Sequence, residues 1–120
     1  MSYFDHEKLD VYVAAIDFVV IASTVVGRLP RGSAYLADQL QRASTSIPFN
    51  IAEGAGESAE QEKARFYRIA RRSATECAAI LHVCEKLTVA DGVTLVQGRE
   101  LLLRIVAMLT KMSRAHTRSQ

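Results

Sequence analysis

The sequence has little of what usually interrupts a chain, with only two prolines and six glycines among its 120 residues. These residue types most often mark turns, so their scarcity argues against a fold of many short elements and predicts a few long ones. A chain of this length is expected to form a single domain, residues 1–120. Its composition, 49% apolar and 23% charged, is that of an ordinary globular protein and argues against intrinsic disorder.

Cysteine is also scarce, and the two present are Cys77 and Cys84. A spacing of seven places both on one face of a helix, separated by about 10 Å of helix rise, which is too far for a disulfide. We therefore expect small core residues in a reducing compartment rather than a metal or redox site.

Features of export and of membrane insertion are weak. The start "MSYFDHEKLD" is mixed in charge and lacks the small-residue cleavage site of a secretory signal. The most apolar run, residues 11–27, is at the short limit for a membrane span and has Asp17 in its middle. We expect this run to be a bundle helix, with no membrane contact, in a cytoplasmic protein.

Apolar residues instead recur at helical spacing, and nowhere do they alternate with the period of a strand. The pattern predicts helices at about 5–29, 33–53, 58–88 and 94–114. Asp5 is expected to cap the first, and Ser58 with Gln61 to form a capping box for the third. Short connections favour antiparallel neighbours, so the predicted fold is all-α, an antiparallel up-down-up-down four-helix bundle. Residues 115–120 are expected to be frayed.

The stretch "STSIPFNIAEGAGES", residues 44–58, poses the main question of function. Pro48 lacks the N–H that would bond the Ser44 carbonyl, which predicts a modest kink, and Gly54 is expected to end the helix in a left-handed conformation. Steps of three and four residues place a set of small and polar residues on one stripe beside the apolar stripe. That set is Gln39, Ala43, Ser46, Asn50 and Glu53.

The same stripe must be weighed as a catalytic site. General acid–base chemistry requires a second titratable group and a pocket. The expected neighbours on the third helix are Ser73 and Glu76, with no histidine and no nucleophile–base pair. We predict a hydrogen-bond network that fixes helix register, and no catalytic residue.

Metal and phosphate sites are not expected either. A di-iron bundle uses Glu-x-x-His pairs on two helices, whereas this chain has one reversed pair, His82-x-x-Glu85, on the expected outer side of the third helix. The stretch "EGAGES" lacks the lysine and the preceding strand of a P-loop. We therefore predict no metal and no cofactor.

Charge is divided unevenly along the chain. Residues 1–60 hold four Lys/Arg against eight Asp/Glu, and residues 61–120 hold eleven against five. The net charge of +2 is far from that of a dedicated nucleic-acid binder, so a solvated or salt-bridged face and a phosphate- or partner-binding face both stay open. The candidate binding residues are Arg65, Arg68, Arg71, Arg72, Lys111 and Arg114.

Two segments, "LADQLQRASTSIPFNIAEGAGES" and "RFYRIARRSATE", carry a resemblance that extends over nearly the whole chain. They resemble a family of bacterial four-helix bundle proteins encoded by intervening sequences in 23S rRNA genes. The matching residues are Gln39, Arg42, Ser46, Ile47, Asn50, Ile51, Ala52, Glu53, Gly54, Phe66, Ile69, Ala70, Ser73 and Glu76. One departure is Arg72, where the family usually has glycine; it either alters close packing or enlarges a basic face.

The resemblance implies a helical protomer that assembles into a closed homopentameric ring and has no enzymatic activity. A branch similar in fold, the accessory proteins of diversity-generating retroelements, works with a reverse transcriptase and its RNA. Our first hypothesis is a non-enzymatic homopentamer that associates with RNA, DNA or a nucleic-acid-processing protein. The alternatives are a structural or protein-binding adaptor with no nucleic-acid role and, third, a small bundle enzyme or metal carrier.

Overall fold

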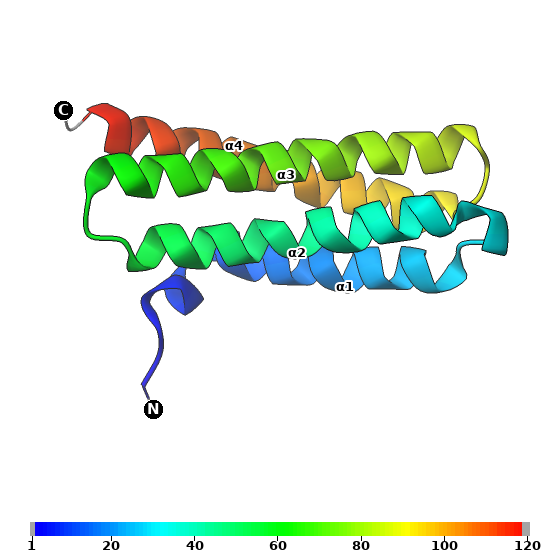
Figure 1. Cartoon of the computed structure of the whole chain (residues 1–120), viewed down its shortest axis with the longest axis horizontal. Coiled ribbons are helices and arrows are strands. Elements are labelled where there is room, and N and C mark those ends of the chain that lie inside the picture. Colours follow the sequence, from blue (N-terminus) through cyan, green and yellow to red (C-terminus); the bar gives the residue numbers. More distant parts are fainter. Residues whose placement is uncertain (1, 119–120) are drawn as a thin grey trace.

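Four long α-helices make up most of the computed structural model, which describes residues 2–118 (Figure 1). They are α1 (Asp10–Arg28), α2 (Ala34–Gly56), α3 (Glu60–Lys86) and α4 (Gly92–Arg118). Two short 3₁₀ helices, η1 (Asp5–Lys8) and η2 (Arg31–Ser33), precede α1 and α2. No strand occurs within the described residues, and the all-α prediction is confirmed.

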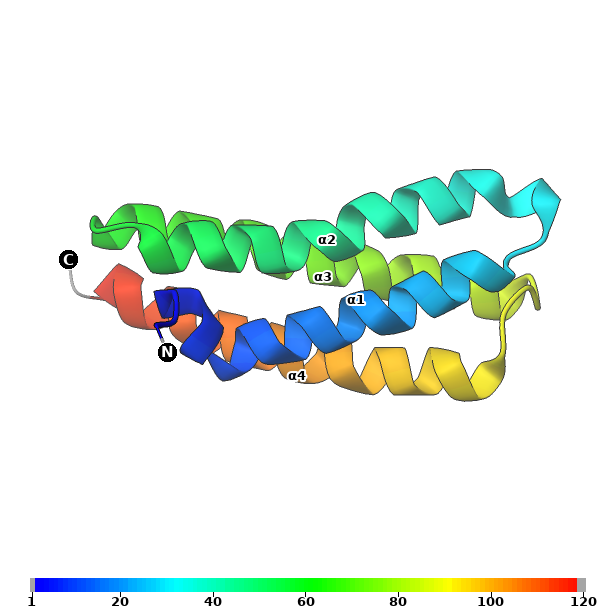
Figure 2. The same cartoon turned by 90° about the horizontal axis from the view of Figure 1, so that it is seen from below.

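The helices form a bundle in which each consecutive pair is antiparallel and in contact. α1 packs on α2, α2 on α3 and α3 on α4, and α1 also packs on α4 to close the bundle. Figures 1 and 2 show the four helices side by side, with both ends of the chain at the same end of the bundle. This is the predicted up-down-up-down arrangement.

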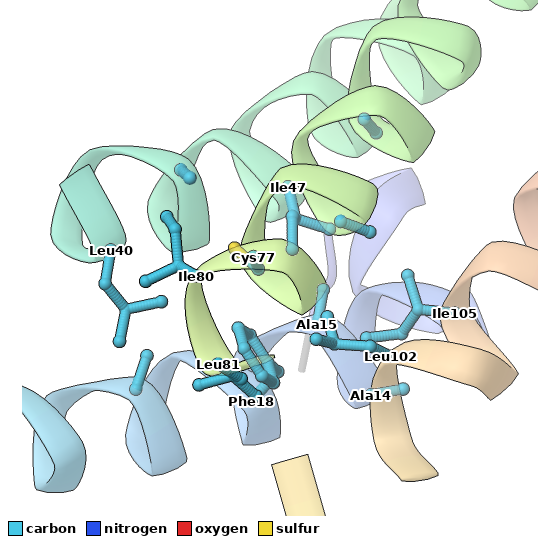
Figure 3. Packing of buried hydrophobic residues seen from close by; sticks show 14 of the residues in the cluster. Ala14, Ala15, Phe18, Leu40, Ile47, Cys77, Ile80, Leu81, Leu102 and Ile105 are labelled. Atoms are coloured by element: carbon cyan, nitrogen blue, oxygen red, sulfur yellow. The ribbon is translucent and has the colours of Figure 1, made fainter. Parts of the chain in front are cut away.

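The core runs the length of the bundle and draws on all four helices (Figure 3). Phe18, Leu40, Ile47, Cys77 and Ile105 are fully buried in it. Burying one large apolar side chain contributes about 1.5–3 kcal/mol, so these contacts supply the main driving force for the fold. The two cysteines lie in this core, as predicted.

The first predicted helix boundary is wrong. Asp5–Lys8 is a separate 3₁₀ helix, and α1 begins only at Asp10, after an extended Leu9. Asp5 does not act as the helix cap; the Glu7 carboxylate instead accepts the backbone N–H of Phe4 at 2.9 Å.

The capping box predicted for the third helix is also wrong. α3 begins at Glu60, so the N-cap position falls on Ala59, which has no side chain able to accept a hydrogen bond. Glu60 and Glu62 lie in the first turn, where their charges favour the positive end of the helix dipole.

α4 begins two residues earlier than predicted, because Asp91 caps it. The Asp91 carboxylate accepts the Thr94 backbone N–H at 3.1 Å and the Thr94 hydroxyl at 2.8 Å. These hydrogen bonds lower the pKa of Asp91. At its other end α4 continues through residues 115–118, which were expected to be frayed; residues 119–120 lie outside the described part.

α2 extends through Pro48 and ends at Gly56, three residues beyond the predicted end. Its axis changes direction near the middle of the helix (Figure 2). Gly54 does not have the left-handed conformation predicted for it: no glycine in the described residues has a positive φ. It lies buried inside the last turns of α2.

Candidate functional site

The polar stripe of α2 meets α3 along one seam. The hydroxyls of Ser46 and Ser73 are hydrogen-bonded at 2.8 Å across the two helices. The Asn50 side-chain amide donates to the Ser46 hydroxyl at 3.0 Å and to the Ser46 carbonyl at 2.8 Å. The predicted inter-helix network therefore exists, and it consists of Ser46, Asn50 and Ser73.

Gln39 and Glu53 of the predicted stripe do not join this network, and neither do Arg42 of the family pattern and Glu76, an expected neighbour on α3. The side chains of Gln39, Arg42, Glu53 and Glu76 lie on the exposed surface. The groups that the seam does join are two hydroxyls and an amide, which exchange hydrogen bonds but do not titrate near neutral pH. The seam can hold two helices in register, and it brings no acid–base pair together.

Gly54 allows close packing of α2 on α3, a role that its position in the sequence does not reveal. A Cβ atom built on Gly54 would lie 2.7 Å from the Cε1 atom of the Tyr67 ring and 3.2 Å from Cβ of Phe66. Such distances are far shorter than van der Waals contact, so only glycine lets α3 approach α2 this closely. Burial raises the pKa of Tyr67, and the nearby Glu60 raises it further.

Lys63 of α3 binds the C-terminal end of α2, next to Gly54. Its ammonium donates to the Gly54 carbonyl at 3.1 Å and to the Ala55 carbonyl at 3.0 Å. These carbonyls lie in the last turn of α2, where a cation also favours the negative end of the helix dipole. Lys63 therefore caps the C-terminal end of α2, a role that its position in the sequence does not reveal.

The candidate arginines of α3 differ in their surroundings. Arg65 donates to the Glu62 carboxylate at 3.0–3.2 Å and lies 4.6 Å from the Phe66 ring centroid. This hydrogen bond lowers the pKa of Glu62 and raises that of Arg65. Arg71 is half-buried and donates to the Thr110 hydroxyl of α4 at 3.4 Å. Arg68 and Arg72 are exposed.

The Arg71–Thr110 contact brings the first half of α3 beside the second half of α4. Lys111 and Arg114 lie on the exposed surface of α4 just beyond Thr110. Residues 65–72 of α3 are therefore level with about residues 109–116 of α4, so Lys111 and Arg114 lie at the same height along the bundle as the candidate arginines of α3. Arg72 is exposed on α3, so the departure from the family pattern adds a charge to the surface and does not alter close packing with a neighbouring helix.

The histidines and cysteines are the remaining side chains with reactive groups. His82 and Glu85 lie with Arg99 on an open groove of about 260 Å³ between α3 and α4, and His116 contacts the Glu60 carboxylate. Burial raises the pKa of the Cys77 thiol to about 12, so this thiol stays protonated at neutral pH. No group of three or more metal-ligating side chains is found among residues 2–118.

Comparison with known proteins supports the resemblance carried by the α2–α3 seam. No curated protein matches the chain significantly. The family model described as 23S rRNA-intervening sequence protein matches residues 7–111, which spans all four helices apart from the end of α4. The chain therefore belongs to the 23S rRNA-intervening sequence protein family.

Proposed function

We propose that this protein is a non-enzymatic, cytoplasmic homo-oligomer, a ring of four-helix bundles, and that α1 carries much of the contact between copies. The observation behind the proposal is the outer surface of α1. Val13, Ile16 and Val20 expose 52%, 39% and 62% of their surface in the single chain. An apolar stripe of this kind marks an interaction surface.

The composition of α1 supports the same conclusion. By length and composition alone, α1 is the one helix of the described chain that is apolar enough to cross a membrane, yet only 33% of its most apolar window is buried in the bundle. A membrane would be a poor cover for the remainder, because Asp10 and Asp17 are exposed on the same helix and a charge at the bilayer centre costs about 2.5–3.5 kcal/mol. Further copies of the chain cover apolar surface without that cost. The number of copies, five, is what the family resemblance implies.

Val20→Lys tests the proposal, because it places a charge in the α1 stripe without touching the core. Sedimentation of the wild-type protein should give an assembly of fixed size, and Val20→Lys should shift it to monomers of unchanged helical content. Val83→Lys, at an exposed valine of α3, is the matched control and should leave the assembly intact. A wild-type protein that sediments as a monomer at micromolar concentration would refute the proposal and favour the adaptor alternative, in which α1 binds another protein.

A second candidate function is nucleic-acid binding by the assembled protein. It is supported by Arg72, Lys111 and Arg114, which are exposed on α3 and α4 at similar heights along the bundle. Repetition of this patch around a ring would raise a weak affinity through multivalency. Contacts of this kind read phosphates rather than base edges, so binding should depend weakly on sequence and strongly on salt.

Anisotropy titrations with structured RNA, single-stranded DNA and duplex DNA test the second candidate. Affinity should fall steeply between about 50 and 200 mM salt. Changing Arg72, Lys111 and Arg114 together to glutamine should flatten that dependence and leave the assembly intact. Arg65→Gln should have less effect, because Arg65 is already paired with Glu62. Absence of binding to all three probes at low salt would remove this candidate.

A further inference from the structure

A second apolar stripe, on α4, matches the one on α1. The α1 stripe comprises Val13, Ile16 and Val20, and the α4 stripe comprises Val96, Leu103 and Ala107, all exposed. Val96 and Leu103 expose 54% and 58% of their surface. The bundle core uses neither stripe, and each has the width of one helix-packing face.

The two stripes face outward on opposite sides of the α1–α4 pair. α1 and α4 meet where Gly98 faces Ile21, since a Cβ atom on Gly98 would lie 3.3 Å from the Ile21 Cγ2 atom. At about 100° per residue, Ile16 lies about 140° from Ile21 around α1, and Leu103 lies about 140° from Gly98 around α4. A single chain therefore cannot bring its own two stripes together, but two copies can.

The stripes also lie at the same height along the bundle. Gly98 of α4 is level with Phe18 and Ile21 of α1 along the bundle axis. Because the two helices are antiparallel, a residue that precedes this point in α1 is level with a residue that follows Gly98 in α4. At about 1.5 Å per residue, Ile16 is level with about position 102 and Val20 with about position 98. These positions lie within the α4 stripe. Rotation without translation along the bundle axis therefore brings the two stripes into register.

Charges at the edge of the stripes favour the same arrangement. Asp17 borders the α1 stripe and is level with about position 101 of α4, between Glu100 and Arg104. α1 carries two acidic residues in its first half, whereas α4 has no acidic residue after Glu100 and carries Arg104, Lys111 and Arg114. Two α1 stripes packed on each other would bring only acidic residues, Asp10 and Asp17, to the contact, whereas α4 offers Arg104 beside Glu100. This comparison favours α4 over a second α1 as the occupant of the stripe.

We propose that α1 of one copy packs on α4 of the next copy, with the two bundles parallel and at the same height. This inference rests on the proposed function and adds the surfaces and the direction of the contact. The two faces differ, so the contact is heterologous, and without translation along the axis it closes into a ring rather than a filament. Nucleic acid could not replace the neighbouring copy on the α4 stripe, because the stripe is apolar and Glu100 is exposed at its centre.

The groove between α3 and α4 is a recess in which a side chain of the neighbouring copy's α1 can lie. Leu95, Val96 and Arg99 line it, and these positions are level with about residues 19–23 of α1. Val20 of the neighbouring copy, the most exposed of the three side chains in the α1 stripe, would therefore lie against this groove. An apolar side chain seated in a partner's recess is typical of the centre of an interface.

Two single variants and their combination test the proposal. Ile16→Lys alters only the α1 face, and Leu103→Glu alters only the α4 face; each alone should be monomeric, because every contact in the ring then carries one unpaired charge. The double variant Ile16→Lys/Leu103→Glu should reassemble, because the introduced lysine of each copy then meets the introduced glutamate of the next. Gln97→Glu, on α4 but about 120° from Leu103, is the control and should assemble normally.

Each other outcome overturns the inference in an identifiable way. If Ile16→Lys disrupts the assembly but Leu103→Glu does not, α1 packs on α1 of a two-fold partner. If neither variant changes the size of the assembly, the copies meet elsewhere: the proposed oligomer then holds, but the contact assigned to α1 does not. If the wild-type protein is itself a monomer, the proposed function fails together with the inference. Ile16→Cys/Leu103→Cys gives a second measurement: disulfide-linked chains should form on oxidation, since Cys77 and Cys84 are buried.

Discussion

At the scale of single residues, the role of Gly54 depends on a contact far away in the sequence. Its place near the end of a helical pattern predicts a left-handed cap, because glycine most often serves there. The structure instead places the Tyr67 ring where a Gly54 side chain would be. Periodicity identifies which face of α2 is buried, but it does not show how closely α3 approaches that face.

Gly54→Ala should therefore destabilise the protein by about 1–3 kcal/mol, because the buried Tyr67 ring cannot move aside freely. Gly56→Ala provides the matched control in the same helix, since a Cβ atom there would meet nothing within 4 Å. It should be neutral or stabilising by up to about 1 kcal/mol. Urea unfolding of both variants checks this, and an equal effect of the two would contradict the role assigned to the Gly54–Tyr67 contact.

Cys77 should make the protein sensitive to alkali. Burial raises its pKa to about 12 from the usual 9.0, so above pH 9 the unfolded chain loses the thiol proton while the folded protein keeps it. The contribution of the protonated Cys77 thiol to the free energy of unfolding is fully present below pH 9 and is lost as the pH rises toward 12. By pH 10 the loss is about 1 kcal/mol. Urea unfolding between about pH 8 and pH 10 should show this loss in the wild type and a smaller one in Cys77→Ala. Equal losses in the two proteins would show that another group is responsible.

At the scale of elements, the number and order of the helices followed from apolar periodicity and their antiparallel direction from the short connections, whereas the ends of the helices could not be predicted in this way. The core positions of α2 and α3 repeat with the helical period, which defines each helix over most of its length. Helix ends depend instead on single backbone conformations and hydrogen bonds, such as those of Ala59 and Asp91. The Ser46–Ser73 contact was anticipated because both residues border a predicted core face, but the exposure of Glu53 depends on the relative rotation of two helices.

The end of α3 illustrates this dependence and leads to a prediction. Thr88 has φ of 56°, the left-handed conformation that side chains branched at Cβ rarely adopt. The Val89 N–H donates to the Cys84 carbonyl at 3.1 Å, as in the Schellman motif that ends many helices. The left-handed position of that motif, here Thr88, is usually occupied by glycine. Thr88→Gly should therefore stabilise the protein by about 0.5–1 kcal/mol, as the relieved strain exceeds the added freedom of the unfolded chain. Thermal unfolding checks the sign, and a lower melting temperature would contradict it.

The seam between α2 and α3 yields a prediction at the same scale. Asn50→Leu removes the amide that bonds Ser46 and should cost about 1 kcal/mol, the lower end of the cost of leaving a hydrogen-bond partner unsatisfied, because the site is half-exposed. Glu53→Ala, one turn further along the same stripe, should change the free energy of unfolding by less than about 0.5 kcal/mol, because Glu53 is exposed. Denaturant unfolding separates the two variants. A larger loss in Glu53→Ala would show that the network extends beyond the three residues named.

At the scale of the whole molecule, the single chain buries a well-packed core but leaves the apolar stripes of α1 and α4 exposed. Every buried side-chain nitrogen and oxygen in the described residues has a hydrogen-bond partner, so the bundle itself is complete. The stripes on α1 and α4 lie outside that bundle, and their position at equal height explains how identical copies can cover them. We therefore expect the functional form to contain several copies of the chain.

Native mass measurement of the unmodified protein tests this claim most directly. One chain has a mass of 13.2 kDa. A closed ring of five should give one dominant species with five times the mass of the chain, unchanged on dilution through the micromolar range, because each copy in the ring is held by two contacts. A single species with the mass of one chain at those concentrations would contradict it.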